Sequence, residues 1–260
     1  MHISESRFVI FPFFALSLRD VLIGSVGHNV IESMNKLPEV TKNLLAINIL
    51  MFLATIVLER QGTDLTSLLG LHFFKASDFE PYQLLTYMFM HSDFSHLFFN
   101  MFALFMFGGV LERVWGSKRF LIYYLVAGVG AGLLQEVTQY IHFAQLGWDA
   151  NALIRVQSLG LVPVSDVLNM WTTVGASGAV YAILLGFGMS FPNEKMFIFP
   201  LPFPIKAKFF VIGYAAIELL LGVSNSQDGI AHYAHLGGML FGLVMILYWR
   251  RKRKIGGPYV

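Results

Sequence analysis

The chain has 260 residues, of which 56% are hydrophobic and only 13% are charged, whereas an ordinary soluble domain has roughly 45–50% apolar and about 25% charged residues. Lys and Arg number 18 against 16 Asp and Glu, so the formal net charge is only +2, which argues against a nucleic-acid partner. Cysteine is absent, which excludes disulfides, thiolate metal sites and cysteine nucleophiles. The composition therefore excludes a soluble globule and favours a membrane protein.

The first 40 residues precede the first long apolar run. Residues 8–18 are apolar and aromatic, but this segment is too short to cross a bilayer. It also lacks the flanks and the small-residue cleavage site of a secretory signal. We interpret residues 1–40 as a cytoplasmic or interfacial N-terminal segment.

Six apolar runs, each near the length of about 20 residues that a membrane helix needs, follow along the chain. They cover residues 43–59, 93–111, 119–140, 174–191, 208–224 and 232–249. The runs predict an all-α, polytopic membrane domain over residues 41–249, followed by a basic cytoplasmic tail over residues 250–260. The connection at 60–92 carries many Leu, Phe and Tyr residues, which suits a segment that lies on the membrane surface.

The distribution of basic residues predicts the orientation of these runs. With a cytoplasmic N-terminus, 15 of the 18 Lys and Arg residues fall in the inner connections and tails, as the positive-inside rule requires. Only Arg60, Lys75 and Arg155 fall in the outer connections. We therefore expect both termini in the cytoplasm, and the inner membrane of a bacterial cell as the location, because no transit-peptide pattern is present.

Polar residues cluster near the starts of the second, fourth and sixth runs. Polar groups inside membrane helices are costly and are functional hypotheses by default. In the predicted topology these three runs all cross from outside to inside, so the clusters lie at one depth, just below the outer surface. The clusters comprise His91, His96 and Asn100; Gly175, Ser177 and Gly178; and His232 and His235.

These residue types are those that acyl transfer requires. A serine hydroxyl needs an adjacent base, most often histidine, and the bases available to Ser177 are His235, His232 and His96. An oxyanion needs hydrogen-bond donors, which the Asn100 amide, a histidine N–H and the N–H of Ser177 at a helix N-terminus can supply. Gly175 and Gly178 would let backbones approach closely.

The motifs and their order resemble the rhomboid family of intramembrane serine proteases. His91-x4-His96-x3-Asn100 resembles the histidine-rich helix of the family. Gly175-Ala176-Ser177-Gly178, with Tyr181 one turn later, resembles its nucleophile segment, and Ala234-His235-Leu236-Gly237-Gly238 resembles its last core helix.

The resemblance implies a six-transmembrane-helix bundle and a function. Ser177 would be the nucleophile and His235 the general base, a dyad without an acid, and Tyr181 would pack on the His235 ring. His96, Asn100 and the Ser177 N–H would form the oxyanion hole. Apart from the resemblance, His91 precedes His96 by five residues, and this spacing predicts that it lies at the mouth of the site. The substrates would be transmembrane segments cut near their outer ends, and no cofactor or metal is expected.

One departure from the family pattern concerns the first outer connection. Rhomboids often carry Trp-Arg nine and eight residues before the first histidine of the second run, and here those positions hold Tyr82 and Gln83. The connection is therefore expected to be anchored differently.

Several residues have plainer interpretations. Gly128-x3-Gly132 and Gly238-x3-Gly242 indicate close helix packing, and Glu218, alone in the fifth run, indicates a hydrogen-bonded carboxyl or a gating role. His232 matches no catalytic position of the family and is expected to line the site or merely to adjoin it. Two rival functions stay open: an inactive rhomboid-like protein that binds membrane helices, and a histidine-based membrane metal or haem protein.

Overall fold

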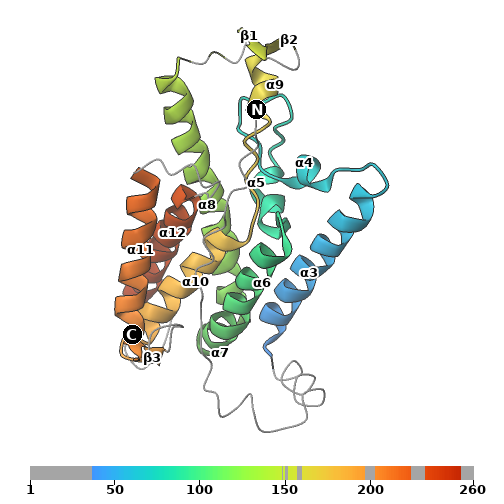
Figure 1. Ribbon diagram of the computed structural model, residues 1–260. Helices are drawn as coiled ribbons and strands as arrows, with labels where there is room; N and C mark the ends of the chain where they lie inside the picture. The colour runs from blue at the N-terminus through green and yellow to red at the C-terminus, as the bar shows by residue number, and fades with distance from the viewer. Residues whose placement is uncertain are drawn as a thin grey trace.

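The computed structural model describes residues 37–147, 149, 152–156, 160–196, 203–223 and 232–252, and these residues form a bundle of helices (Figure 1). The predicted N-terminal segment up to residue 36 and the basic tail from residue 253 lie outside the described residues. The helices of the bundle are α3 (Glu39–Glu59), α6 (Phe94–Ala103), which continues through the π-helix η2 (Leu104–Gly108) into α7 (Gly109–Trp115), α8 (Ser117–Gln145), α10 (Ser177–Ser190), α11 (Ala207–Val223) and α12 (His232–Arg251).

The connections between these helices carry short elements. They are α4 (Leu65–Leu69), α5 (Gln83–Thr86), the 3-10 helix η1 (Tyr87–Phe89) and α9 (Val164–Leu168), with strands β1 (Leu153–Val156), β2 (Gly160–Pro163), β3 (Lys195–Met196) and β4 (Ile205–Lys206). The strands pair as two small antiparallel hairpins, β1 with β2 and β3 with β4. The purely helical expectation is therefore correct for the bundle and misses these two hairpins.

Each of the six predicted apolar runs overlaps one of the bundle helices. Among the described residues, three helices are long and apolar enough to cross a membrane: α3, the continuous helix Phe94–Trp115, and α8. Helix α10 is apolar but has only 14 residues. The chain is thus an integral membrane protein by the length and composition of these helices, and the six-span arrangement stays a prediction.

Helices α8, α10 and α12 pack closely at the centre of the bundle. Small residues permit this approach: a Cβ on Gly238 of α12 would lie 1.9 Å from the carbonyl oxygen of Gly178 in α10, and a Cβ on Gly178 would lie 2.4 Å from the Cβ of Ala131 in α8. Helices α3 and α11 lie at opposite edges of the bundle (Figure 1). Both expose many large apolar side chains, as contact with lipid requires.

Gln83 anchors the connection between α3 and α6. Its side chain is 1% exposed, and its Oε1 accepts from the backbone N–H groups of His72 and Glu80. Its Nε2 donates to the carbonyl oxygens of Asp78 and Leu68. At the position where many rhomboids carry arginine, this amide therefore holds the loop through four backbone hydrogen bonds.

Candidate active site

Ser177 is the first residue of α10, and the loop before it is fixed to the connection between α3 and α6. Thr173 and Leu71 exchange backbone hydrogen bonds of 2.8 and 2.9 Å, and the N–H of Gly175 donates to the carbonyl oxygen of Tyr87 at 2.9 Å. Gly175 has φ +127°, a conformation that other residues rarely adopt. The backbone N–H groups of the first helical turn lack intrahelical acceptors, so Ser177 stands where an anion can be bound.

His235 of α12 contacts the Ser177 hydroxyl. Its Nε2 lies 2.9 Å from Ser177 Oγ, a hydrogen-bond distance. Tyr181, one turn after the serine, stacks on the His235 ring with centroids 4.2 Å apart and planes 7° from parallel. The stacked ring and the close approach of α10 to α12 fix the imidazole against the hydroxyl.

His96 lies near Ser177, beside the Gly175 backbone position from which a Cβ would reach both side chains. A Cβ on Gly175 would fall 2.7 Å from His96 Nε2 and 3.6 Å from Ser177 Oγ, so the absence of a side chain at Gly175 lets this ring approach the serine. The backbone N–H of His96 donates to Asp93, the N-cap of α6. Its Nδ1 lies 3.1 Å from the Ser92 hydroxyl.

Asn100 contacts His96 through a hydrogen bond, and His91 contacts it through its ring. Asn100 is buried one turn later, and its Nδ2 donates to the His96 carbonyl at 3.0 Å; an amide carries a second N–H beyond that one. His91 is only 2% exposed, with its ring centroid 5.0 Å from that of His96. His91 is therefore buried beside His96 and does not lie at an open mouth.

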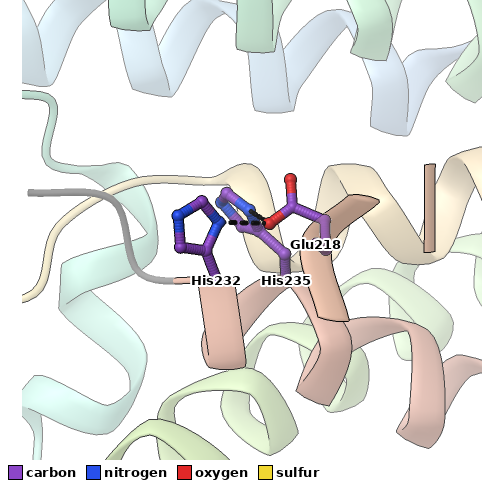
Figure 2. Close-up of side chains that lie close together, drawn as sticks. All are labelled: Glu218, His232 and His235. Carbon is purple, nitrogen blue, oxygen red and sulfur yellow. Dashed lines mark hydrogen bonds and ion pairs between the residues drawn. The ribbon is translucent and has the colours of Figure 1, made fainter. Parts of the chain in front are cut away.

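Glu218 of α11 lies beside the Ser177–His235 pair and is a hydrogen-bonded carboxyl. Its Oε1 accepts a hydrogen bond from the Tyr181 hydroxyl, and its Oε2 lies 2.7 Å from His232 Nδ1. The same Oε2 lies 3.1 Å from His235 Nδ1, at ion-pair distance but outside hydrogen-bond geometry. Figure 2 shows both imidazole rings directed at this one carboxylate.

Sequence patterns contained a weak signal for this arrangement. A carboxylate in an apolar membrane helix needs partners, but the partners of Glu218 lie 37, 14 and 17 residues away on α10 and α12. Helical spacing relates residues three or four apart and could not identify these partners. His232 also contributes to this arrangement, because its Nδ1 contacts the same Glu218 oxygen that faces His235 Nδ1.

Glu218, His232 and His235 also form a possible metal-ligand set. Their three ligand atoms lie within 4.8 Å of one another, and two histidines with one carboxylate can bind zinc. However, the 2.7 Å between Glu218 Oε2 and His232 Nδ1 is a hydrogen-bond distance. Ligands on tetrahedral zinc lie roughly 3.3 Å apart, given bonds of about 2.0–2.1 Å. The arrangement therefore fits a hydrogen-bonded cluster better than a metal centre.

Comparisons with known proteins agree with these motifs. The chain is 29% identical over 167 residues to the rhomboid protease AarA of Providencia stuartii, covering 62% of this chain and 53% of that protein. It is 26% identical to rhomboid protein 1, mitochondrial, of Saccharomyces cerevisiae, covering 60% of this chain and 38% of that protein. It is 25% identical to the rhomboid protease GlpG of Haemophilus influenzae, covering 79% of this chain and 88% of that protein.

The chain thus spans about half or less of the length of AarA and of the yeast protein, and most of the length of GlpG. The family model of the Rhomboid domain matches residues 78–252. This range takes in the Gly175–Gly178 segment at the start of α10, the helices α6 and α12, and most of the bundle. The chain therefore belongs to the rhomboid family.

Proposed function

We propose that this protein is an intramembrane serine endopeptidase that cleaves transmembrane segments of other membrane proteins near their outer ends. The observation that carries the proposal is the 2.9 Å contact between His235 Nε2 and Ser177 Oγ, at the N-terminus of a helix within an apolar bundle. The relatives AarA and GlpG, which are named rhomboid proteases, support the same activity. The proposed fold is the six-span bundle with both termini in the cytoplasm of a bacterial cell.

In the proposed reaction, His235 Nε2 takes the proton of Ser177 as the Oγ attacks the carbonyl carbon of the scissile bond. The resulting imidazolium gives that proton to the nitrogen of the leaving peptide, and the C–N bond breaks. Water then attacks the carbonyl carbon of the acyl-enzyme and gives a proton to His235. His235 returns that proton to Ser177 Oγ as the ester C–O bond breaks. No metal or cofactor takes part in these steps.

The oxyanion of each tetrahedral intermediate would be bound by three donors: the Ser177 N–H, the second N–H of Asn100 and His96 Nε2. The Ser92 hydroxyl bears on the last of these. It donates to Asp93 Oδ2 at 2.9 Å and has a single proton, so its oxygen accepts from His96 Nδ1. A ring that donates through both nitrogens is the imidazolium form, so His96 would act as an oxyanion donor in its protonated state.

Cleavage of a membrane-embedded reporter tests the proposal. The purified protein is mixed in liposomes with a single-span protein that carries small residues near the outer end of its helix. We expect a cut within that end, located by mass spectrometry, and no cut with Ser177→Ala.

Two results would reject the protease: an intact reporter with the folded wild type, or equal cutting by Ser177→Ala. An intact reporter that still binds the protein would instead support an inactive helix-binding relative.

A further inference from the structure

A buried carboxylate on α11 completes a chain of polar contacts that begins at the serine. Ser177 Oγ contacts His235 Nε2, and His235 Nδ1 lies 3.1 Å from Glu218 Oε2. Glu218 and His235 are only 5% and 7% exposed. Three helices, α10, α12 and α11, therefore each contribute one member of this chain, and the helix opposite α3 at the bundle edge supplies the acid.

We propose that Glu218 is a positioning residue for His235, which makes the site a Ser177–His235–Glu218 arrangement in place of an acid-free dyad. This inference rests on the proposed protease function. A carboxylate at Nδ1 keeps the proton on that nitrogen and leaves Nε2 free to accept the serine proton. It also stabilises the positive charge that the ring acquires during the reaction.

The contacts around Glu218 fit this role. Oε1 is held by the Tyr181 hydroxyl and Oε2 by His232 Nδ1, so the carboxylate is fixed from two sides. His235 Nδ1 has no hydrogen-bond partner among the described residues, and Glu218 Oε2 is the acceptor beside it. A small rotation of either side chain aligns the pair once the ring is charged, because a charged N–H attracts the carboxylate more strongly than a neutral one.

Several ionisable groups besides Glu218 face His235 and influence its protonation. They are Tyr181 on α10, His232 on the same helix and His96 on α6, with Tyr214 of α11 next to Glu218. Of these groups, the carboxylate is the one that favours an imidazolium by its charge. A variant that removes the charge of Glu218 and keeps the shape of its side chain isolates the effect of this charge on His235.

The test compares the wild type, Glu218→Gln and Glu218→Asp by the rate of labelling with a serine-directed fluorophosphonate, measured from about pH 5 to 9. Glutamine keeps the size of the side chain and loses the charge. We expect labelling by Glu218→Gln to slow by about 10- to 100-fold, with the acidic limb of its profile moved to lower pH. Aspartate should restore part of the rate.

Tyr233→Phe is the matched control. The Tyr233 hydroxyl donates to the Gly222 carbonyl at 3.0 Å, so this variant loses a hydrogen bond between α12 and α11 that does not touch His235. Its pH profile should match the wild type even where its melting temperature falls.

Three results would overturn the inference. A labelled wild type with an unchanged rate and profile in Glu218→Gln would show that the carboxylate does not act through His235. A slower rate in Glu218→Gln with an unmoved profile would show a structural role alone. One bound zinc per purified wild-type chain, lost in Glu218→Gln, would show a metal centre. An unlabelled but folded wild type would instead reject the protease function itself.

Discussion

At the scale of single residues, the geometry of the site depends on the absence of a side chain at Gly175. Gly175 has no side chain where a Cβ would fall 2.7 Å from His96 Nε2, and its φ of +127° suits glycine. His96 and Ser177 can adjoin each other only because of this gap. The glycine is therefore part of the geometry of the proposed oxyanion hole.

We expect Gly175→Ala to slow fluorophosphonate labelling by roughly 10²-fold, the effect of losing one oxyanion donor, because the new methyl group displaces His96. Gly62→Ala is the control, since Gly62 also has a positive φ, +85°, but has no atom within 4 Å of an added Cβ. Both variants carry backbone strain, so equal labelling by the two would refute the specific role of Gly175.

His91 makes stability depend on pH. Burial, together with the neighbouring His96, lowers the pKa of His91 from 6.5 to about 3. Between these values the unfolded chain binds a proton that the folded chain does not, so the free energy of unfolding falls as the pH is lowered through this window. Above pH 6.5 both states are neutral at this residue, and its contribution is constant.

The melting temperature in detergent should therefore fall less steeply below about pH 6.5 in His91→Asn than in the wild type. The exposed His142 provides the matched variant, His142→Asn, which should keep the wild-type slope. An equal slope in all three proteins would contradict the buried, neutral state of His91.

At the scale of elements, one carboxylate joins the starts of two helices. Helix α3 begins after Pro38 with no side-chain cap of its own. Glu112 of α7 accepts hydrogen bonds from the backbone N–H groups of Val40 and Thr41, at 3.0 and 2.7 Å, and from the Ser117 hydroxyl at the start of α8. It acts as an N-cap for α3 supplied from another helix.

Glu112→Ala should lower the free energy of unfolding by about 1–3 kcal/mol, because it leaves buried donors without an acceptor. Glu59→Ala, at the exposed end of α3, should have little effect. Thermal unfolding in detergent gives the comparison, and equal melting temperatures for the two variants would exclude the capping role.

Element positions were largely predictable, whereas contacts between elements were not. All six apolar runs overlap bundle helices, because the length and hydropathy that a bilayer imposes are properties of the local sequence. The hairpins and the Gln83 anchor join residues no more than 15 apart, but they lie in the connections, where no apolar run marks them. The partners of Glu218 lie 14 to 37 residues away on other helices. The site residues were proposed from motif resemblance and from a shared depth, and neither of these carries information on the direction in which Glu218 points.

At the scale of the whole molecule, helices α10 and α12, which carry Ser177 and His235, meet through small residues. A Cβ on Gly238 would lie 1.9 Å from the Gly178 carbonyl oxygen, closer than any real contact. His235 and Gly238 lie one turn apart on α12, so the distance between α12 and α10 determines the distance between His235 and Ser177.

Gly238→Ala should push α12 from α10, lower the melting temperature by several degrees and abolish fast labelling of Ser177. Gly213→Ala on α11, where an added Cβ has no atom within 4 Å, should leave both properties near wild type. A fully active Gly238→Ala protein would show that the close contact does not set the geometry of the site.

We propose that His235 activates Ser177 inside a membrane bundle. Labelling of the purified protein by a fluorophosphonate in detergent, with the labelled residue identified by mass spectrometry, tests this activation. We expect labelling at Ser177, none in Ser177→Ala, and a loss of at least about 10²-fold in rate in His235→Ala. A folded wild type that stays unlabelled, or a His235→Ala protein labelled at the wild-type rate, would contradict it.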